Sequence, residues 1–270
     1  MGRVYLVGAG PGAPDLLTLR AARLLAAADI VLHDARVHPE TLALAVRAEL
    51  VAVGKRCGAH STAQRFINKR LVDAARKHDV VVRLKGGDPL LFGRAQEEIA
   101  ALAAAGIACE VVPGITAATA ASAQLGVSLT QRGVARSVAF VTPRIGDEES
   151  GSDWAAAALA ADTAAIYMGA GQAAAVARTL IDRGRAADTP VAVVRDASLP
   201  GSTARTGMLR DLAALCAMDC AGEADGARGA VAGPAMILLG AALREAAAAG
   251  APGLGGDNDF TRPLRLLGAG

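Results

Sequence analysis

Two glycine-rich loops contain the residues of this chain that are best suited to binding a small molecule. The sequence Arg-Leu-Lys-Gly-Gly-Asp-Pro at residues 83–89 follows an apolar run, and so does Gly-Ala-Gly-Pro-Gly-Ala at residues 8–13. Glycine lets a backbone approach a ligand without interference from Cβ, and Asp88 offers a hydrogen-bond acceptor. Each loop connects a predicted strand to a predicted helix. We therefore expect both loops to hold a ligand.

The loop at residues 8–13, which we call the first glycine loop, fits the loose fingerprint of a dinucleotide-binding fold. Asp34 follows it by roughly 20 residues, where such folds place a ribose-binding acid. Pro11 and Pro14, however, remove two backbone N–H donors that would serve a pyrophosphate. A smaller or differently held nucleoside is therefore favoured. A nicotinamide-dependent oxidoreductase remains an alternative, as does a plain tight turn at residues 8–12.

Short apolar runs alternate with longer helical patterns along the chain, which is typical of α/β proteins. In the first half Gly106 suits a helix stop and Ser61 a helix cap. Strands are predicted at residues 4–7, 30–33, 50–53, 80–84 and 109–112, and helices at residues 15–27, 39–45, 61–77 and 96–105.

The segment Pro-Gly-Ile-Thr at residues 113–116 interrupts this pattern, so a domain boundary is placed there. Beyond it, strands are predicted at residues 137–142, 164–168, 191–195, 203–207 and 235–240, and helices at residues 117–124, 153–161, 173–183 and 209–218. The predicted fold class is α/β, with an N-terminal α/β domain at residues 1–113, a C-terminal α/β domain at residues 114–245 and a flexible tail at residues 246–270.

Composition excludes several other classes of protein. The net charge of +2 gives no argument for binding nucleic acid or a membrane surface. No apolar run reaches the ~20 residues that span a bilayer, and the predicted first strand leaves no room for a signal peptide. The four cysteines and four histidines lack the spacing of metal ligands. We expect a cytoplasmic enzyme without a metal.

Seven motifs, in the same order along the chain, resemble the tetrapyrrole methylases, which are class III S-adenosylmethionine-dependent methyltransferases. The similarity is greatest to the branch that methylates uroporphyrinogen III, and it covers roughly residues 3–243. The motifs are residues 4–12, residues 53–56 with His60, residues 84–89 with 92–94, residues 111–117, residues 129–130 with 132–133, residues 167–169 and residues 234–235.

The resemblance implies that two methyl groups pass from S-adenosylmethionine to neighbouring pyrrole rings of uroporphyrinogen III. The products would be precorrin-2, for sirohaem or cobalamin synthesis, and S-adenosylhomocysteine. It also implies a homodimer with the cofactor between the two domains. Asp34 and Lys55 occupy the positions of a proton acceptor and a proton donor. The family's cofactor contacts fall on Pro11, Gly86, Gly87, Asp88, Leu91, Thr116, Ala117, Met168 and Ala197.

The substrate carries eight carboxylates, which bidentate arginine side chains suit. The predicted substrate-binding residues are Arg36, Arg56, Arg94, Arg132 and Arg136. The alternative for each is a solvated surface charge. Asp34 is alternatively an acceptor of a local hydrogen bond, and Lys55 is alternatively a contact of a substrate carboxylate. Met168 is alternatively a core residue.

Several departures from the family pattern bear on these roles. Residues 33–37 read His-Asp-Ala-Arg-Val instead of the usual Tyr-Asp-Arg/Ala-Leu-Val, and Ala197 replaces a glycine, so its backbone contact requires a negative φ. We expect the fused oxidase and chelatase module of some relatives to be missing, and therefore methyltransferase activity alone. A methylase of a later precorrin and an inactive cofactor-binding protein remain alternatives.

Overall fold

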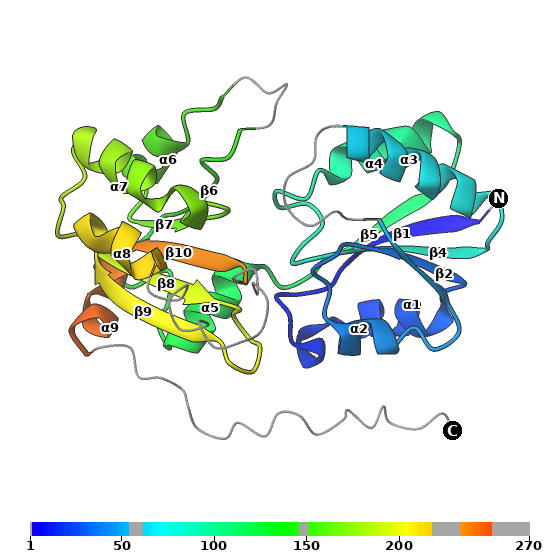
Figure 1. Ribbon diagram of the computed structural model, residues 1–270, viewed down its shortest axis with the longest axis horizontal. Helices are drawn as coiled ribbons and strands as arrows, with labels where there is room; N and C mark the ends of the chain where they lie inside the picture. Colours follow the sequence, from blue (N-terminus) through cyan, green and yellow to red (C-terminus); the bar gives the residue numbers. More distant parts are fainter. Residues whose placement is uncertain (1, 54–61, 146–150, 218–232, 250–270) are drawn as a thin grey trace, which may run out of the picture.

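The computed structural model describes residues 2–53, 62–145, 151–217 and 233–249. In this part of the chain two five-stranded sheets, each with helices on both faces, form two lobes (Figure 1). The predicted roles of Lys55 and Arg56, and the helix cap at Ser61, fall outside the described residues.

The first sheet is entirely parallel, in the order β3-β2-β4-β1-β5. Its near-continuous apolar runs are those of strands covered on both faces. The strands are β1 (Arg3–Gly8), β2 (Ile30–His33), β3 (Glu49–Ala52), β4 (Val80–Lys85) and β5 (Cys109–Val112).

Two separate cores cover the faces of this sheet. Val4 and Leu6 pack with α3 (Thr62–Ala75) and α4 (Ala95–Ala104), whereas Val7 packs with α1 (Leu19–Ala27) and the region of α2 (Pro39–Ala43). This division follows from the alternation of side chains along a strand. Figure 1 shows α1 and α2 on one side of the sheet and α3 and α4 on the other.

The neighbouring strands β1 and β4 lie where the chain direction diverges. After β1 the chain enters α1 on one face, and after β4 it enters α4 on the other (Figure 1). Open α/β sheets bind ligands at the carboxyl ends of strands at such a switch point. Both glycine loops of the sequence follow these two strands.

The second sheet is mixed, in the order β6-β7-β10-β8-β9, and only β6 and β7 are parallel. Ile166 packs in the core beneath α6, α7 and α8, and its neighbour Ala165 packs against α5 on the other face. The elements are β6 (Val138–Val141), β7 (Thr163–Ile166), β8 (Pro190–Arg195), β9 (Thr203–Met208), β10 (Ala235–Gly240), α5 (Ala117–Leu125), α6 (Trp154–Ala160), α7 (Ala173–Asp182), α8 (Leu212–Ala217) and α9 (Arg244–Ala249).

The predicted strands agree with the structure to within one or two residues, and the helices differ more. The helix predicted at residues 15–27 is a 3₁₀ turn, Pro14–Leu16, followed by α1, because Thr18 accepts a hydrogen bond from the Ala21 N–H and caps α1. α4 ends at Ala104, and Gly106 with φ +70° follows it and stops the helix, as predicted.

The predicted domain boundary at residues 113/114 and the predicted tail from residue 246 stay predictions, and the structure gives the elements on either side of them. β5 ends at Val112, and α5 packs on the second sheet. α9 continues to Ala249, and Ala246 is buried, although the sequence placed a flexible tail from residue 246.

Candidate functional site

Three glycines bring the carboxyl ends of β1, β4 and β5 into direct backbone contact. A Cβ on Gly114 would lie 2.3 Å from the Gly87 carbonyl oxygen, and a Cβ on Gly8 would lie 2.6 Å from the Gly114 Cα. The Gly87 N–H donates to the Gly10 carbonyl (2.7 Å), and the Gly10 N–H donates to the Gly87 carbonyl (3.3 Å). The two predicted ligand loops are therefore joined to each other, through contacts that larger residues would prevent.

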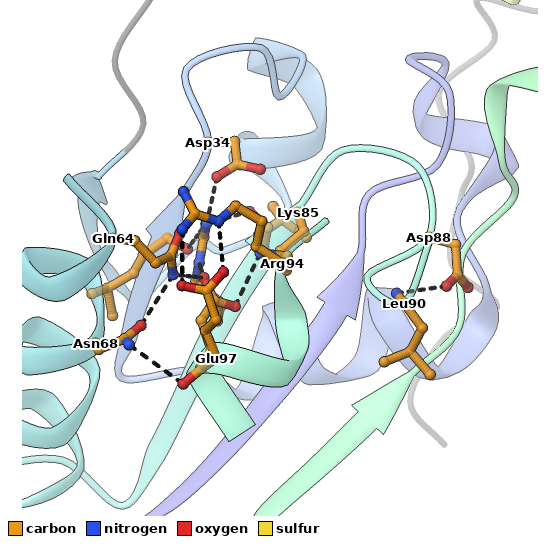
Figure 2. A network of polar contacts seen from close by, with 12 residues as sticks. Asp34, Gln64, Asn68, Lys85, Asp88, Leu90, Arg94 and Glu97 are labelled. Atoms are coloured by element: carbon orange, nitrogen blue, oxygen red, sulfur yellow. Dashed lines mark hydrogen bonds and ion pairs between the residues drawn. The ribbon is translucent and has the colours of Figure 1, made fainter. Parts of the chain in front are cut away.

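Asp88 reinforces this junction. Its Oδ2 accepts a hydrogen bond from the Gly114 N–H (3.0 Å), and its Oδ1 accepts one from the Leu90 N–H (2.8 Å; Figure 2). The sequence predicted Asp88 as a cofactor contact, and the structure shows in addition that it ties two loops together. A carboxylate has lone pairs beyond these two bonds, so both functions are compatible.

Gly86 and Gly87 border open space. Among the residues that the structure describes, and apart from its chain neighbours, no atom lies within 4 Å of a Cβ built on either glycine. This is the opposite of Gly114, whose environment is filled by backbone. The loop is therefore held from one side and open on the other, as a loop that binds a ligand through its backbone requires.

The amide groups of the first glycine loop are largely used within the protein. The Ala9 N–H donates to the Lys85 carbonyl, the Gly10 N–H to the Gly87 carbonyl, and the Ala13 N–H to the Ser198 hydroxyl. A pyrophosphate would need such donors. The structure thus speaks against the dinucleotide alternative for this loop.

Tyr167 contacts residues of both lobes beside the second glycine loop, at residues 83–89. The Thr116 and Tyr167 hydroxyls lie 2.6 Å apart, and the ring centroids of Phe92 and Tyr167 lie 5.0 Å apart. Burial raises the pKa of the Tyr167 phenol. The next residue, Met168, has φ +55° and is 44% exposed, so it is not a core residue. The structure therefore places the predicted contacts Thr116 and Met168 near each other.

The turn after β8 completes this group of loops. Ala197 is buried between Asp196 (φ +50°) and Ser198 (φ +75°), and its own φ is not positive, which meets the condition for a backbone contact. The Ser198 hydroxyl accepts from the Ala13 N–H (3.1 Å), and the Ser198 N–H donates to Gln124 Oε1 (3.3 Å). The sequence did not single out Ser198 or Gln124 as connectors.

A buried network of charges lies beneath Asp34. Arg83 and Lys85 on β4 are 2% and 3% exposed, and Glu98 on α4 is 0% exposed. Arg83 Nε donates to Glu98 Oε1 and Lys85 Nζ donates to Glu98 Oε2, both at 3.0 Å. Arg83 Nη2 donates to Asp34 Oδ1, and the Asp34 side chain is 35% exposed (Figure 2). Asp34 is thus the exposed end of a formally neutral group of four charges.

Burial and the neighbouring charges act differently on the two cations. Burial lowers the pKa of Lys85, and repulsion from Arg83 lowers it further, against the attraction of Glu98. Burial also works against the charge on Arg83, but attraction by Asp34 and Glu98 outweighs it, so the pKa of Arg83 is raised. Arg83 therefore remains a charged donor to Asp34.

The sequence prediction missed Glu98 and gave Arg83 and Lys85 no role. A signal was present for Glu98, because it shares the apolar face of α4 with Ala95 and Leu102. A carboxylate at such a position requires buried cations as partners.

The predicted substrate arginines fall at two different places. Arg36 is exposed after β2, and Arg94 precedes α4 with φ +54° and pairs with Glu97 (2.6 Å). Both follow the carboxyl ends of strands in the first sheet, as Asp34 does.

Arg132 and Arg136 are not brought to the same end of the second sheet as Met168. The Arg136 N–H donates to Asp162 at the amino ends of the parallel strands β6 and β7, whereas Met168 follows the carboxyl end of β7. Arg132 lies in the turn before Arg136 and is exposed. These two arginines are therefore separated from the predicted cofactor residues by the length of the strands.

The described residues offer neither a cluster of metal ligands nor a membrane-spanning helix. They contain no group of three or more histidine, cysteine, aspartate or glutamate side chains arranged to hold a metal ion. Nor does any helix among them have the length and apolar character to cross a membrane.

Comparisons with known proteins agree on one family. The family model for Tetrapyrrole (Corrin/Porphyrin) Methylases matches residues 3–213. A siroheme synthase of Chromobacterium violaceum is 48% identical over 240 residues, covering 88% of this chain and 49% of that protein. One of Psychrobacter sp. is 49% identical over 215 residues, covering 79% of this chain and 44% of that protein. The chain thus spans about half the length of the curated relatives it matches.

Solved structures are similar over nearly the whole described fold. The native form of uroporphyrin III C-methyl transferase from Thermus thermophilus has a TM-score of 0.75 and 38% identity, covering 90% of this chain and all of that one. A structure of the Thermus enzyme with S-adenyl homocysteine has a TM-score of 0.73, 37% identity and the same coverage. A cobalt precorrin-4 methyltransferase has a TM-score of 0.75 and 29% identity, covering 89% of this chain and 95% of that one.

Proposed function

The chain belongs to the tetrapyrrole methylases, and from this premise we propose that it is a uroporphyrinogen-III C-methyltransferase. The reaction is the transfer of two methyl groups from S-adenosylmethionine to neighbouring pyrrole carbons of uroporphyrinogen III, giving precorrin-2 for sirohaem or cobalamin. The observation that carries this proposal is the glycine junction with open space at Gly86 and Gly87. It belongs to a fold whose relative from Thermus was solved with S-adenyl homocysteine.

The residues around the junction suit an S-adenosyl ligand. Such a ligand needs close backbone approach, acceptors for its hydroxyl and ammonium groups, and an apolar wall. Open glycine backbone, the Asp88 carboxylate and the exposed Met168 side chain offer these three features. We assign the ligand to the predicted residues Pro11, Gly86, Gly87, Asp88, Leu91, Thr116, Ala117, Met168 and Ala197.

When bound, S-adenosylmethionine supplies an electrophilic methyl group on a sulfonium. The protein's own contribution is to align the macrocycle with that group, since positioning can provide much of the rate of a displacement. The two lobes are held together beside the site by the Ala13–Ser198 and Phe92–Tyr167 contacts, which limit relative motion of the loops.

Asp34 is our candidate to accept the proton that the macrocycle releases. Arg83 holds its Oδ1, and we assign proton acceptance to Oδ2. Arg36 and Arg94, which also follow strands of the first sheet, are assigned to substrate carboxylates. Lys55 and Arg56 keep their predicted roles as proton donor and substrate contact. The position of Arg132 and Arg136 favours the alternative of solvated surface charges.

The test is to incubate the protein anaerobically with uroporphyrinogen III and methyl-labelled S-adenosylmethionine, and to count the methyl groups on the tetrapyrrole by mass. Two added groups support the proposal. One group indicates that the second transfer stalls. No added group, together with binding of S-adenosylhomocysteine, would refute this substrate and leave an inactive binder or a different macrocycle.

A methylase of a later precorrin is the second candidate. It is favoured by the similarity to the cobalt precorrin-4 methyltransferase, but that identity is 29% against 38% for the Thermus enzyme. The paired motifs Gly-Lys-Arg at residues 54–56 and Lys-Gly-Gly-Asp-Pro at residues 85–89 favour uroporphyrinogen III. Parallel incubations with both macrocycles decide between the two candidates.

A homodimer working in the cytoplasm completes the proposal. Exposed large apolar residues of the second lobe, among them Val134 and Phe140, offer surface for association, and the free thiol of Cys109 suits a reducing compartment. Light scattering on a sizing column measures the mass directly, and a monomeric mass would exclude the dimer.

A further inference from the structure

We propose that Glu98 is a positioning residue that fixes the Arg83 guanidinium against Asp34. The orientation of Arg83 by Glu98 follows from the contacts of the two side chains. The effect on catalysis rests on the proposed function. Glu98 itself is fully buried, so it acts through Arg83 and does not touch the substrate.

The Glu98 carboxylate is held in one orientation by three side chains. Oε1 accepts from Arg83 Nε (3.0 Å) and Gln64 Nε2 (3.4 Å), and Oε2 accepts from Lys85 Nζ (3.0 Å). Gln64 also donates to Asn68 Oδ1 (3.0 Å), so α3 supports the carboxylate from a second helix (Figure 2). The orientation of Glu98 is therefore set by both helices on this face of the sheet.

The Arg83 guanidinium is bonded along all of its edges. Nε bonds Glu98, Nη2 bonds Asp34, and Nη1 donates to the carbonyls of Leu32 (3.4 Å) and Leu84 (3.1 Å). Of these partners only Asp34 has an exposed side chain. Glu98 thus sets, from the buried side, the direction in which Arg83 presents its outer N–H group.

Stability alone is a poor reason for this arrangement. Buried ion pairs are often matched or exceeded in stability by apolar residues of similar volume, because desolvation offsets the attraction. Glu98 shares the buried face of α4 with the apolar residues Ala95 and Leu102, where an apolar side chain would be expected. A role in orienting Arg83 at the edge of the site accounts for a carboxylate there.

Loss of the Glu98 charge should therefore move Arg83. In Glu98→Gln one carboxylate oxygen becomes an NH₂ group, which donates and cannot accept, so the Arg83 Nε–H loses the charged acceptor that fixes its direction. We expect Arg83 to withdraw from Asp34, with the backbone of β4 unchanged.

The kinetic test compares Glu98→Gln with Glu110→Gln. Glu110 is in the same sheet and pairs with Arg20 at 3.3 Å on the surface, so it controls for the chemical change. In Glu98→Gln we expect kcat to fall roughly 100-fold, as for a misplaced catalytic group, with the KM for uroporphyrinogen III and the Kd for S-adenosylhomocysteine within about two-fold. An unchanged kcat overturns the proposal.

The double variant Lys85→Met with Glu98→Gln separates positioning from stability. It removes the ammonium group that Glu98→Gln leaves unpaired, so the melting temperature should recover. If kcat stays low, the loss comes from Arg83. If kcat recovers as well, Glu98 only neutralises Lys85 and the proposal is wrong.

Crystal structures of the native protein and of Glu98→Gln give a readout that does not depend on turnover. Failure of the native protein to methylate uroporphyrinogen III refutes the proposed function alone. Retention of the Arg83 bond to Asp34 in Glu98→Gln refutes the positioning role, whatever the activity, and its loss supports that role.

Discussion

Replacing Gly114 with alanine tests whether the three-glycine junction holds the ligand loops in place. The added Cβ would lie 2.3 Å from the Gly87 carbonyl oxygen and 2.8 Å from the Gly8 Cα. Ordinary contact between such atoms begins near ~3.4 Å, so the carbonyl must withdraw by about 1 Å. Gly114 has no positive φ, and the change therefore tests the contact without backbone strain.

The Gly87 carbonyl cannot withdraw freely. It accepts from the Gly10 N–H, while the Gly114 N–H is bonded to Asp88. Overpacking costs about 1–3 kcal/mol, and this constraint places Gly114→Ala in the upper part of that range. At about 2–4 °C per kcal/mol for a protein of this size class, we expect the melting temperature to fall by roughly 4–12 °C.

The assay is thermal unfolding of Gly114→Ala and of Gly171→Ala, with calorimetric titration of S-adenosylhomocysteine. A Cβ on Gly171 meets no atom of the described residues within 4 Å, so that variant controls for glycine replacement. We expect Gly114→Ala alone to lose stability and affinity. Equal melting temperatures for the two variants would refute the reasoning about the junction.

Three further predictions concern single contacts. Gly86→Ala should have the melting temperature of the native protein, because its Cβ meets no atom of the described part of the chain within 4 Å. It should nevertheless bind S-adenosylhomocysteine at least roughly ten-fold more weakly, and unchanged binding would argue against the assigned site. Ser198→Ala should lower the free energy of unfolding by about 1 kcal/mol, because the Ala13 N–H loses its acceptor. The Ala13 amide should then exchange its hydrogen faster with solvent, and unchanged exchange at Ala13 would exclude this bond. Hydrogen bonds from the backbone of Arg136 and the side chain of Ser137 lower the pKa of Asp162 below its ordinary 3.8. The stability from these bonds is present above pH 3.8 and is lost as the pH falls through the lowered pKa. Asp162→Asn should therefore have a lower melting temperature than the native protein at pH 7 and the same melting temperature in strong acid. A constant difference in melting temperature across this pH range would contradict the assignment.

Local patterns in the sequence were sufficient to predict the elements and the two ligand loops. Short runs of four to six residues between helical patterns, most of them apolar, predicted all ten described strands to within two residues. Glycine marked the turns at residues 8–13 and 86–87, because the need for close backbone approach is local and visible in residue type. The chemistry of the family likewise followed from short motifs at fixed positions.

Contacts between distant elements depended on the tertiary structure. Glu98 read as part of an ordinary helix, because its partners Arg83 and Lys85 lie on a strand and only packing shows that all three are buried together. Arg136 read as a substrate residue, but the direction of β6 places it at the end of the strand pair away from Met168. Residue type limits what a side chain is able to bind, whereas the partners it meets depend on how strands and helices pack, and that packing is a property of the whole chain.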